Sequence, residues 1–430
     1  MTVRSLACIR SIHLGESMTE QYDGGGESQI SPQAELDIDS LLKRAFDGEI
    51  NLLTLTRRER LEVVAKIAQY FKENAEKHDR AGTFPFENYR LLRAIHFPAL
   101  TIPKTLGGGG ISLEEMLRLQ AEIAKNDGST GLAIGWHMGI SKHLGENKLW
   151  AEALYRDFAE EVISQGALIN NAATERATGS PTRGGRPETT AVKEGNHWRL
   201  NGRKTFTTLS PVLDFFAVSA SIEGSDQVAS FLVRRDLPGV SIEESWDSIS
   251  MSATGSHDLV LEDVLLDADD LAQYLIPGEK QPQGWLLHIP AVYFGIATGA
   301  YEEALHFANH YRSNAMPAPV GNFPTVQQKL GEIRVLLLEM EYFLFGVAKE
   351  WDEADQAMRS TMGEVLSAVK IATVNNALKV VDLAMRIVGA RSLAQSHPLS
   401  RAYRDVRAGL HNPPMEDMVY TQLAKGVLTF

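Results

Sequence analysis

The sequence predicts an α+β fold, mostly α, in which a central antiparallel β-domain separates two helical regions. Three observations lead to this prediction. The chain has 430 residues, too many for a single hydrophobic core. Both ends of the chain carry segments with helical apolar periodicity, and short β-type runs lie between them. We expect a flexible tail over residues 1–35, a helical domain over 36–165, the β-domain over 166–280 and a helical bundle over 281–430.

The N-terminal region first looks like a tail and then becomes helical. Its first 35 residues are polar and contain three consecutive glycines. Apolar residues recur at spacings of three and four over residues 61–71, which is typical of an amphipathic helix. Ser112 and Glu115 have the spacing of a capping box and predict the start of another helix. The apolar stretch 131–144 predicts a buried helix.

Short runs rich in Val, Ile, Phe, Thr and Leu begin near residue 166. Turn residues such as Glu194–Gly195–Asn196 separate them, and no strand–helix alternation is present, so a parallel dinucleotide-binding sheet is not expected. Residues 198–208 are expected to form a hairpin followed by a strand. The predicted strands are 189–193, 197–200, 204–208, 215–219, 229–233, 240–244 and 258–261.

The last third of the chain predicts long helices over residues 293–310, 326–350 and 358–388. Many of them are apolar on more than one face, so they need neighbours on several sides. Some of those neighbours are expected to come from another subunit.

Composition excludes several classes of protein. The net charge of −13 argues against a nucleic-acid partner, and no apolar run reaches the roughly 20 residues of a membrane span. The N-terminus lacks the features of a secretion signal, so a cytoplasmic location is expected.

A single cysteine, Cys8, rules out an internal disulfide framework. His306 and His310 lie four residues apart, but no third ligand is marked and no metal site is expected.

Two segments of the β-region carry the most specific chemistry. Residues 171–181 end a short strand with hydroxyl groups and a Gly-Ser turn, which can offer amides and hydroxyls to a polar ring edge. Residues 198–208 end in an aromatic residue and two threonines. Each segment alone is also compatible with an ordinary turn and strand.

Together these segments resemble the acyl-CoA dehydrogenase family. Thr174-Glu175 with Gly179-Ser180 is similar to its T-E-x-x-x-G-S-D motif, and residues 198–208 match W-x-L-N-G-x-K-x-[WF]-[IT]-[TS] almost position for position. Further matches follow in order at residues 231–240, 251–264, 295–300, 386–390 and 404–405, so the resemblance covers about residues 40–430.

The resemblance implies a subunit with N-terminal helices, a central β-domain and a C-terminal four-helix bundle, assembled as a homotetramer. It implies FAD bound between the β-domain and the bundle, where a flavin can accept hydride. The residues that the motifs place near the cofactor are Ala173, Thr174, Gly179, Ser180, Phe206, Thr208, Gly389 and Ala390.

The catalytic base of the family is missing from its usual positions. The commonest base is a glutamate eight residues beyond the Arg-Asp pair, and counting eight from Asp405 gives Pro413. Some members take the base from the first helix of the bundle, where this chain has Trp285. His411 and Glu416 are the nearest replacements. A neutral imidazole is a competent base, whereas Glu416 has the alternative role of an acidic helix N-terminus.

The Leu-His-x-Pro sequence at residues 410–413 also resembles two-component flavin monooxygenases, which receive reduced flavin from a reductase. His137 is similar to a histidine of that branch, although it is also typical of a hydrogen-bonded histidine in a buried helix.

We therefore expect an FAD-dependent oxidoreductase that desaturates an acyl-CoA thioester, with an electron-transferring flavoprotein as acceptor. The alternative is a two-component monooxygenase acting on a small aromatic or sulfur compound, with FMN as cofactor and a flavin reductase as partner. A flavin-binding protein without turnover is a third reading.

Overall fold

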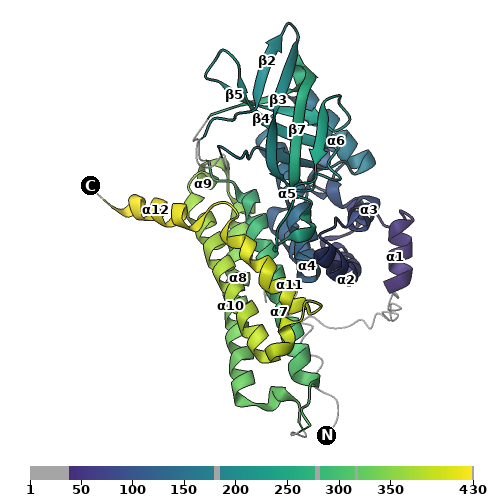
Figure 1. Cartoon of the computed structure of the whole chain (residues 1–430), viewed down its shortest axis with the longest axis vertical. Coiled ribbons are helices and arrows are strands. Elements are labelled where there is room, and N and C mark those ends of the chain that lie inside the picture. The colour runs from purple at the N-terminus through teal and green to yellow at the C-terminus, as the bar shows by residue number, and fades with distance from the viewer. Residues whose placement is uncertain (1–37, 179–184, 277–280, 315–317, 429–430) are drawn as a thin grey trace, which may run out of the picture. The chain divides into compact units, whose positions relative to one another are not determined.

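The computed structural model describes residues 38–178, 185–276, 281–314 and 318–428. Residues 38–430 form one compact unit, in which helices precede and follow a central sheet (Figure 1). This order confirms the predicted α+β, mostly α fold class.

The N-terminal helices begin at caps that the sequence encodes. Thr56 and Glu59 form a reciprocal capping box at the start of α2, and Ser112 accepts a hydrogen bond from the Glu115 amide as predicted. Asp352 of the C-terminal region adds a second cap, because its carboxylate accepts from the first two amides of α4 at 2.7 and 2.9 Å. The helices are α1 (Ile38–Phe46), α2 (Arg57–Ala81), α3 (Phe86–Ala94), α4 (Leu113–Asn126), α5 (Gly128–Asn147) and α6 (Glu152–Gln165).

The strands of the described residues form one eight-stranded sheet in the order β6-β7-β3-β2-β4-β5-β8, with β1 paired to β4. Every residue of β4 is buried, so this strand lies inside the β-domain core. The strands are β1 (Ile169–Ala172), β2 (Thr190–Glu194), β3 (His197–Thr207), β4 (Phe215–Ile222), β5 (Val228–Arg234), β6 (Val240–Glu243), β7 (His257–Asp267) and β8 (Leu271–Leu275).

The sheet differs from the prediction in three ways. Residues 198–208 do not form a hairpin followed by a strand, because β3 runs continuously from His197 to Thr207 and absorbs the break as register shifts against β7. The hairpin turn lies earlier, between β2 and β3. The sheet is mostly antiparallel, but β4 pairs in parallel with β1 and β2. Strand β8 was not predicted.

The C-terminal helices are α7 (His288–His310), α8 (Pro324–Glu353), α9 (Gln356–Arg359), α10 (Gly363–Val388), α11 (Pro398–Asp405) and α12 (Glu416–Val427). Helices α7, α8 and α10 lie side by side (Figure 1). Helix α7 also packs on α4 at close range, because a Cβ at Gly295 or Gly299 would lie 2.4 or 2.3 Å from a backbone oxygen of α4. These contacts join the first and last helical regions.

Helix α12 leads away from the bundle toward the C-terminus (Figure 1). Val419 is its only buried residue among those described, and Tyr420 and Val427 are exposed. No helix in the described part of the chain is both long enough and apolar enough to cross a membrane.

Candidate functional site

An exposed aromatic ring marks one face of the β-domain. Phe206, at the end of β3, is 64% exposed and has a left-handed backbone with φ 56°, which is uncommon for a bulky residue. Its ring lies edge-on to Trp246 with centroids 5.8 Å apart. The Thr208 hydroxyl exchanges a 2.8 Å hydrogen bond with Ser256, and the Asn170 amide donates to the Thr208 carbonyl at 2.9 Å. Phe206 and Thr208, both predicted to contact the cofactor, therefore lie together at the C-terminal end of β3.

The segment after β1 approaches this strand end. The Thr174 carbonyl accepts a 2.8 Å hydrogen bond from the Thr205 amide. Thr174 and Ala173 are half-buried. The structure thus brings Ala173 and Thr174 next to β3. The predicted Gly179 and Ser180 lie outside the described residues.

Glu175 holds the segment after β1 in place through hydrogen bonds of its buried carboxylate. Its buried carboxylate accepts from the Lys204 ammonium at 2.6 Å, from the hydroxyl of Thr189 at 2.6 Å and from the hydroxyl of Thr178 at 2.8 Å. It also accepts from the amides of Glu188 and Thr189. Burial raises the pKa of Glu175, but the hydrogen bonds, led by that from Lys204, outweigh it and lower the pKa to about 2. The motif glutamate is a structural anion, a role that the sequence analysis did not assign.

The segment between β6 and β7 supports Phe206, and sequence reasoning missed it. His257 Nδ1 accepts from the amides of Ser245 and Trp246, both at 3.1 Å, so this nitrogen carries no proton. The Trp246 indole donates to the Met251 carbonyl at 3.1 Å. The sequence shows Trp246 between two predicted strands, which could have marked this segment as a candidate. Its contact with Phe206 could not be predicted, because the two residues are 40 positions apart in the sequence.

His137 lies in the interior and not on the exposed face. Its Nε2 lies 3.1 Å from the Pro98 carbonyl, and its Nδ1 accepts from the Ile169 amide at 3.1 Å. Burial lowers the pKa of His137 to about 4. Both ring nitrogens are occupied, and the ring joins α5 to β1. This geometry favours the structural role that the sequence left open.

The predicted base region follows α11. His411 ends the 3₁₀ turn Val406–Leu410 and its side chain is exposed. The neighbouring Asn412 accepts a hydrogen bond from the hydroxyl of buried Tyr293 on α7. Pro413 follows and offers neither a carboxylate nor an amide N–H. The turn is therefore fixed to the bundle while the imidazole remains available.

Glu416, the other candidate base, is engaged elsewhere. Its carboxylate accepts from the Tyr420 hydroxyl at 2.6 Å and from Asn375 at 2.9 Å. These two hydrogen bonds lower the pKa of Glu416, so the carboxylate is a weak proton acceptor.

Aromatic rings surround Trp285, the predicted alternative base position, which lies in the 3₁₀ turn Gly284–Leu287 just before α7. Trp285 is buried and contacts Trp136 and His143, each with centroids 5.9 Å apart. It is also parallel to His288, at 5.7 Å. No carboxylate takes part in these ring contacts.

Gly389 and Ala390 lie at the C-terminal end of α10, where both are exposed and Gly389 has φ 72°. They share no hydrogen bond with Phe206 or Thr208 within the described residues.

The residues of the β-domain face fit a flavin. An exposed aromatic side chain held by a strained backbone offers a wall for a flat ring, and the half-buried Thr174 carries a hydroxyl that can contact a polar ring edge. Three of the predicted contacts, Thr174, Phe206 and Thr208, converge there. Among the described residues no cluster of three potential metal ligands occurs.

The fold and this face define a flavoprotein oxidoreductase. Models of the acyl-CoA dehydrogenase N-terminal, middle and C-terminal domains match residues 56–147, 170–264 and 287–412. The chain is 49% identical over 369 residues to a putative acyl-CoA dehydrogenase, YdbM, of Bacillus subtilis, with 86% of this chain and 96% of the relative covered. The protein belongs to the acyl-CoA dehydrogenase family.

A further relative and two solved structures are similar to this chain at lower identity. An L-evernosamine nitrososynthase of Micromonospora is 27% identical over 385 residues, which cover 83% of this chain and 86% of the relative. The structure of KijD3 with FMN and a dTDP-linked amino sugar has a TM-score of 0.77 at 25% identity, covering 89% of this chain and 97% of that one. TdsC of Paenibacillus with FMN and indole shares the fold, with a TM-score of 0.77 at 23% identity over 86% of this chain and 97% of that one.

Proposed function

We propose that this protein is a flavin-dependent monooxygenase that receives reduced flavin from a separate reductase. One feature of the sequence supports the proposal: counted from the family motifs, neither expected position of the carboxylate base holds an acid. Pro413 occupies one position, and buried Trp285 occupies the other. The nearest acid, Glu416, is tied to Asn375 and Tyr420. Removal of an α-proton would lack its usual acceptor, whereas oxygen transfer needs no carboxylate base.

The bound reduced flavin would supply two electrons, so that one atom of dioxygen enters the substrate and the other leaves as water. The residues of the chain would bind the flavin and orient it. Phe206 would flank the ring, while Thr174 and Thr208 would fix its edge. His411 would donate or accept a proton at its exposed imidazole, and Tyr293 would hold its turn through Asn412.

Two relatives support FMN as the cofactor, because KijD3 and TdsC were both solved with FMN. The family resemblance alone favoured FAD. We also propose a homotetramer, in which a neighbouring subunit would cover α12 and bring its Gly389–Ala390 turn to the cofactor. The exposed Tyr420 and Val427 of α12 support this proposal.

The test supplies FMN, a flavin reductase and NADH under isotope-labelled dioxygen to a panel of small aromatic and organosulfur compounds. The expected result is a product that carries one labelled oxygen atom and depends on the protein. The His411→Ala variant should lose this product, whereas a matched exposed histidine variant, His306→Ala, should retain it. NADH oxidation that yields only hydrogen peroxide with every compound would contradict the proposal.

Acyl-CoA dehydrogenation is the second candidate, and the 49% identical relative named a putative acyl-CoA dehydrogenase favours it. In that reaction His411 would take the α-proton, because it is the available candidate near the missing base. An electron-transferring flavoprotein would then be the partner.

A further inference from the structure

Asp405, the last residue of α11, reaches across to the β-domain. Its side chain is 2% exposed, and its Oδ1 accepts a 2.7 Å hydrogen bond from the Met251 amide. Its backbone carbonyl accepts a second bond from the Ser250 hydroxyl at 3.3 Å. The next residues of the chain form the turn that leads to His411. One carboxylate thus joins the segment carrying the proposed acid–base group to the loop between β6 and β7.

Met251 connects Asp405 to residues of the β-domain through its backbone amide and carbonyl. Its backbone is left-handed, with φ 54°, which costs a non-glycine residue about 1 kcal/mol or more. The Met251 carbonyl accepts from the Trp246 indole at 3.1 Å and from the Thr254 hydroxyl at 2.9 Å. The strained conformation therefore persists because hydrogen bonds hold both sides of the same residue.

The two residues that donate to the Met251 carbonyl, Trp246 and Thr254, lead to Phe206 and Thr208, which we call the flavin wall. Trp246 contacts the Phe206 ring edge-on. The Thr254 hydroxyl exchanges a 2.8 Å hydrogen bond with Ser256, which exchanges another of 2.8 Å with Thr208. A continuous set of contacts thus runs from the Asp405 carboxylate to both Phe206 and Thr208.

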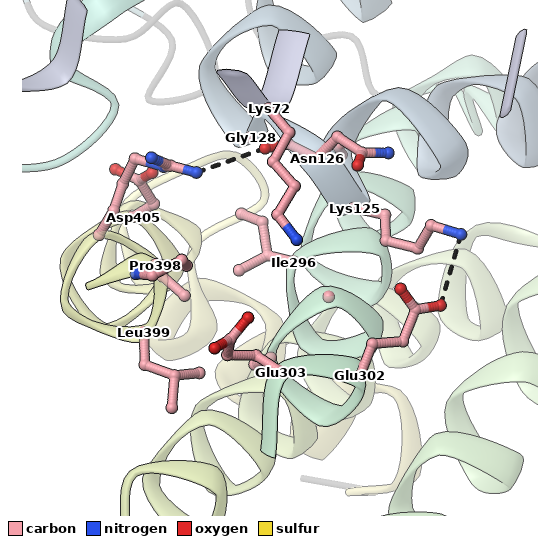
Figure 2. A pocket seen from close by; sticks show the side chains of 15 residues that line it. Lys72, Lys125, Asn126, Gly128, Ile296, Glu302, Glu303, Pro398, Leu399 and Asp405 are labelled. Atoms are coloured by element: carbon pink, nitrogen blue, oxygen red, sulfur yellow. Dashed lines mark hydrogen bonds and ion pairs between the residues drawn. The ribbon is translucent and has the colours of Figure 1, made fainter. Parts of the chain in front are cut away.

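A small cavity gives this carboxylate a route to water. Figure 2 shows Asp405 on one side of the cavity and the Lys72 side chain pointing into it. Its volume of about 50 Å³ has room for a few water molecules, since each needs roughly 10–15 Å³. Burial raises the pKa of Asp405 to about 7, against the lowering effects of the Met251 amide and of Arg401. The carboxylate can therefore exchange a proton in the neutral range.

Charged groups face Asp405 from each neighbouring element. Asp79 of α2 and Asp127 at the start of α5 both raise its pKa, whereas Arg401 on its own helix lowers it. Tyr293 of α7 lies close enough for Asp405 to raise the tyrosine pKa. Arg404 is paired with Asp79, at 2.9 Å, and Asp405 also helps to raise the pKa of this guanidinium.

We propose that Asp405 is a positioning residue that couples α11 to the flavin-flanking residues Phe206 and Thr208 through the backbone of Met251. The proposal rests on the proposed flavin site. The ionised carboxylate accepts a charge-assisted hydrogen bond from Met251, and protonation weakens that bond. Below neutral pH the left-handed Met251 loses support, and the flavin wall is less well ordered. Flavin affinity should then fall about fivefold, the difference between a charged and a neutral hydrogen bond.

The test measures the FMN dissociation constant across the neutral pH range by quenching of flavin fluorescence. Wild type should bind about fivefold more weakly on the acidic side of a step near pH 7. Asp405→Asn should bind like the acidic wild type at every pH. Asp382→Asn, an exposed acid paired with Arg386 on α10, should behave like wild type. A step that persists unchanged in Asp405→Asn would overturn the proposal.

A second measurement does not need flavin. Hydrogen exchange of the apoprotein should show faster exchange in peptides covering residues 245–256 for Asp405→Asn and for Trp246→Phe, with other peptides unchanged. Unaltered exchange in that segment would overturn the coupling. If wild type does not bind FMN but Asp405→Asn still exchanges faster in residues 245–256, the proposed flavin site is wrong. The coupling between Asp405 and the loop that carries Met251 is then still supported.

Discussion

The buried pair of Glu175 and Lys204 offers a test with a magnitude that the structure sets. Lys204 is fully buried and Glu175 is 2% exposed. The Glu175→Gln substitution keeps the shape of the side chain but removes its charge, so the Lys204 ammonium retains only neutral hydrogen-bond acceptors, among them Ser219 at 3.3 Å. Removing one member of a buried pair costs about 3–5 kcal/mol. We therefore expect a loss of about 3 kcal/mol in the free energy of unfolding.

Urea denaturation of the apoprotein, followed by tryptophan fluorescence, measures this loss. The matched control is Glu194→Gln, which breaks an exposed pair with Arg199 in the same sheet and should cost less than about 1 kcal/mol. The double variant Glu175→Gln/Lys204→Met should recover part of the loss, because no unpaired charge remains buried. Equal costs for Glu175→Gln and Glu194→Gln would refute the reasoning.

Acid should act on the same pair. The folded pKa of Glu175, about 2, lies below its usual value of 4.5. The stabilisation is therefore complete above the usual value and is lost as the pH falls toward 2. Glu175→Gln should remove this acid-dependent part of the unfolding free energy.

Three further predictions concern the candidate site. Phe206→Ala should weaken FMN binding about fivefold in a fluorescence titration, because an aromatic contact contributes about 1 kcal/mol, with stability changed by less than about 0.5 kcal/mol; unchanged affinity would remove Phe206 from the site. The pKa of His137 is lowered by burial from 6.5 to about 4, so unfolding free energy should decline on acidification between these values, and a His137→Gln variant should lack that decline. His411→Ala should leave the urea midpoint unchanged but slow product formation by about 100-fold or more, since general acid–base groups contribute that much; equal rates would exclude His411.

Local patterns were enough to predict much of the fold. The capping residue Ser112 and the buried helix over 131–144 appear as expected, because caps and apolar periodicity act within a few residues. Strand β8 was missed because its five residues alternate between apolar and polar only weakly. The single strand β3 was divided in the prediction because Gly202 suggests a turn, whereas pairing with β7 carries the chain through it.

The candidate site was only partly predictable, because its supports are distant in sequence. Motif spacing pointed to Thr174, Phe206 and Thr208, which the sheet brings together. The hydrogen bond between Asp405 and Met251 joins residues 154 positions apart, and no local pattern signals it. The two backbone partners of His137 are equally invisible to spacing and periodicity.

We expect no desaturation of acyl-CoA thioesters by this member of the family, because Pro413 and Trp285 supply no carboxylate at the two expected base positions. The most direct test is an anaerobic titration of the flavin-loaded protein with a panel of acyl-CoA thioesters, followed by the absorbance of oxidised flavin. No thioester should bleach the flavin, although dithionite should do so fully. Bleaching by any acyl-CoA, with its enoyl product detected, would contradict the proposed monooxygenase function and establish the protein as a dehydrogenase.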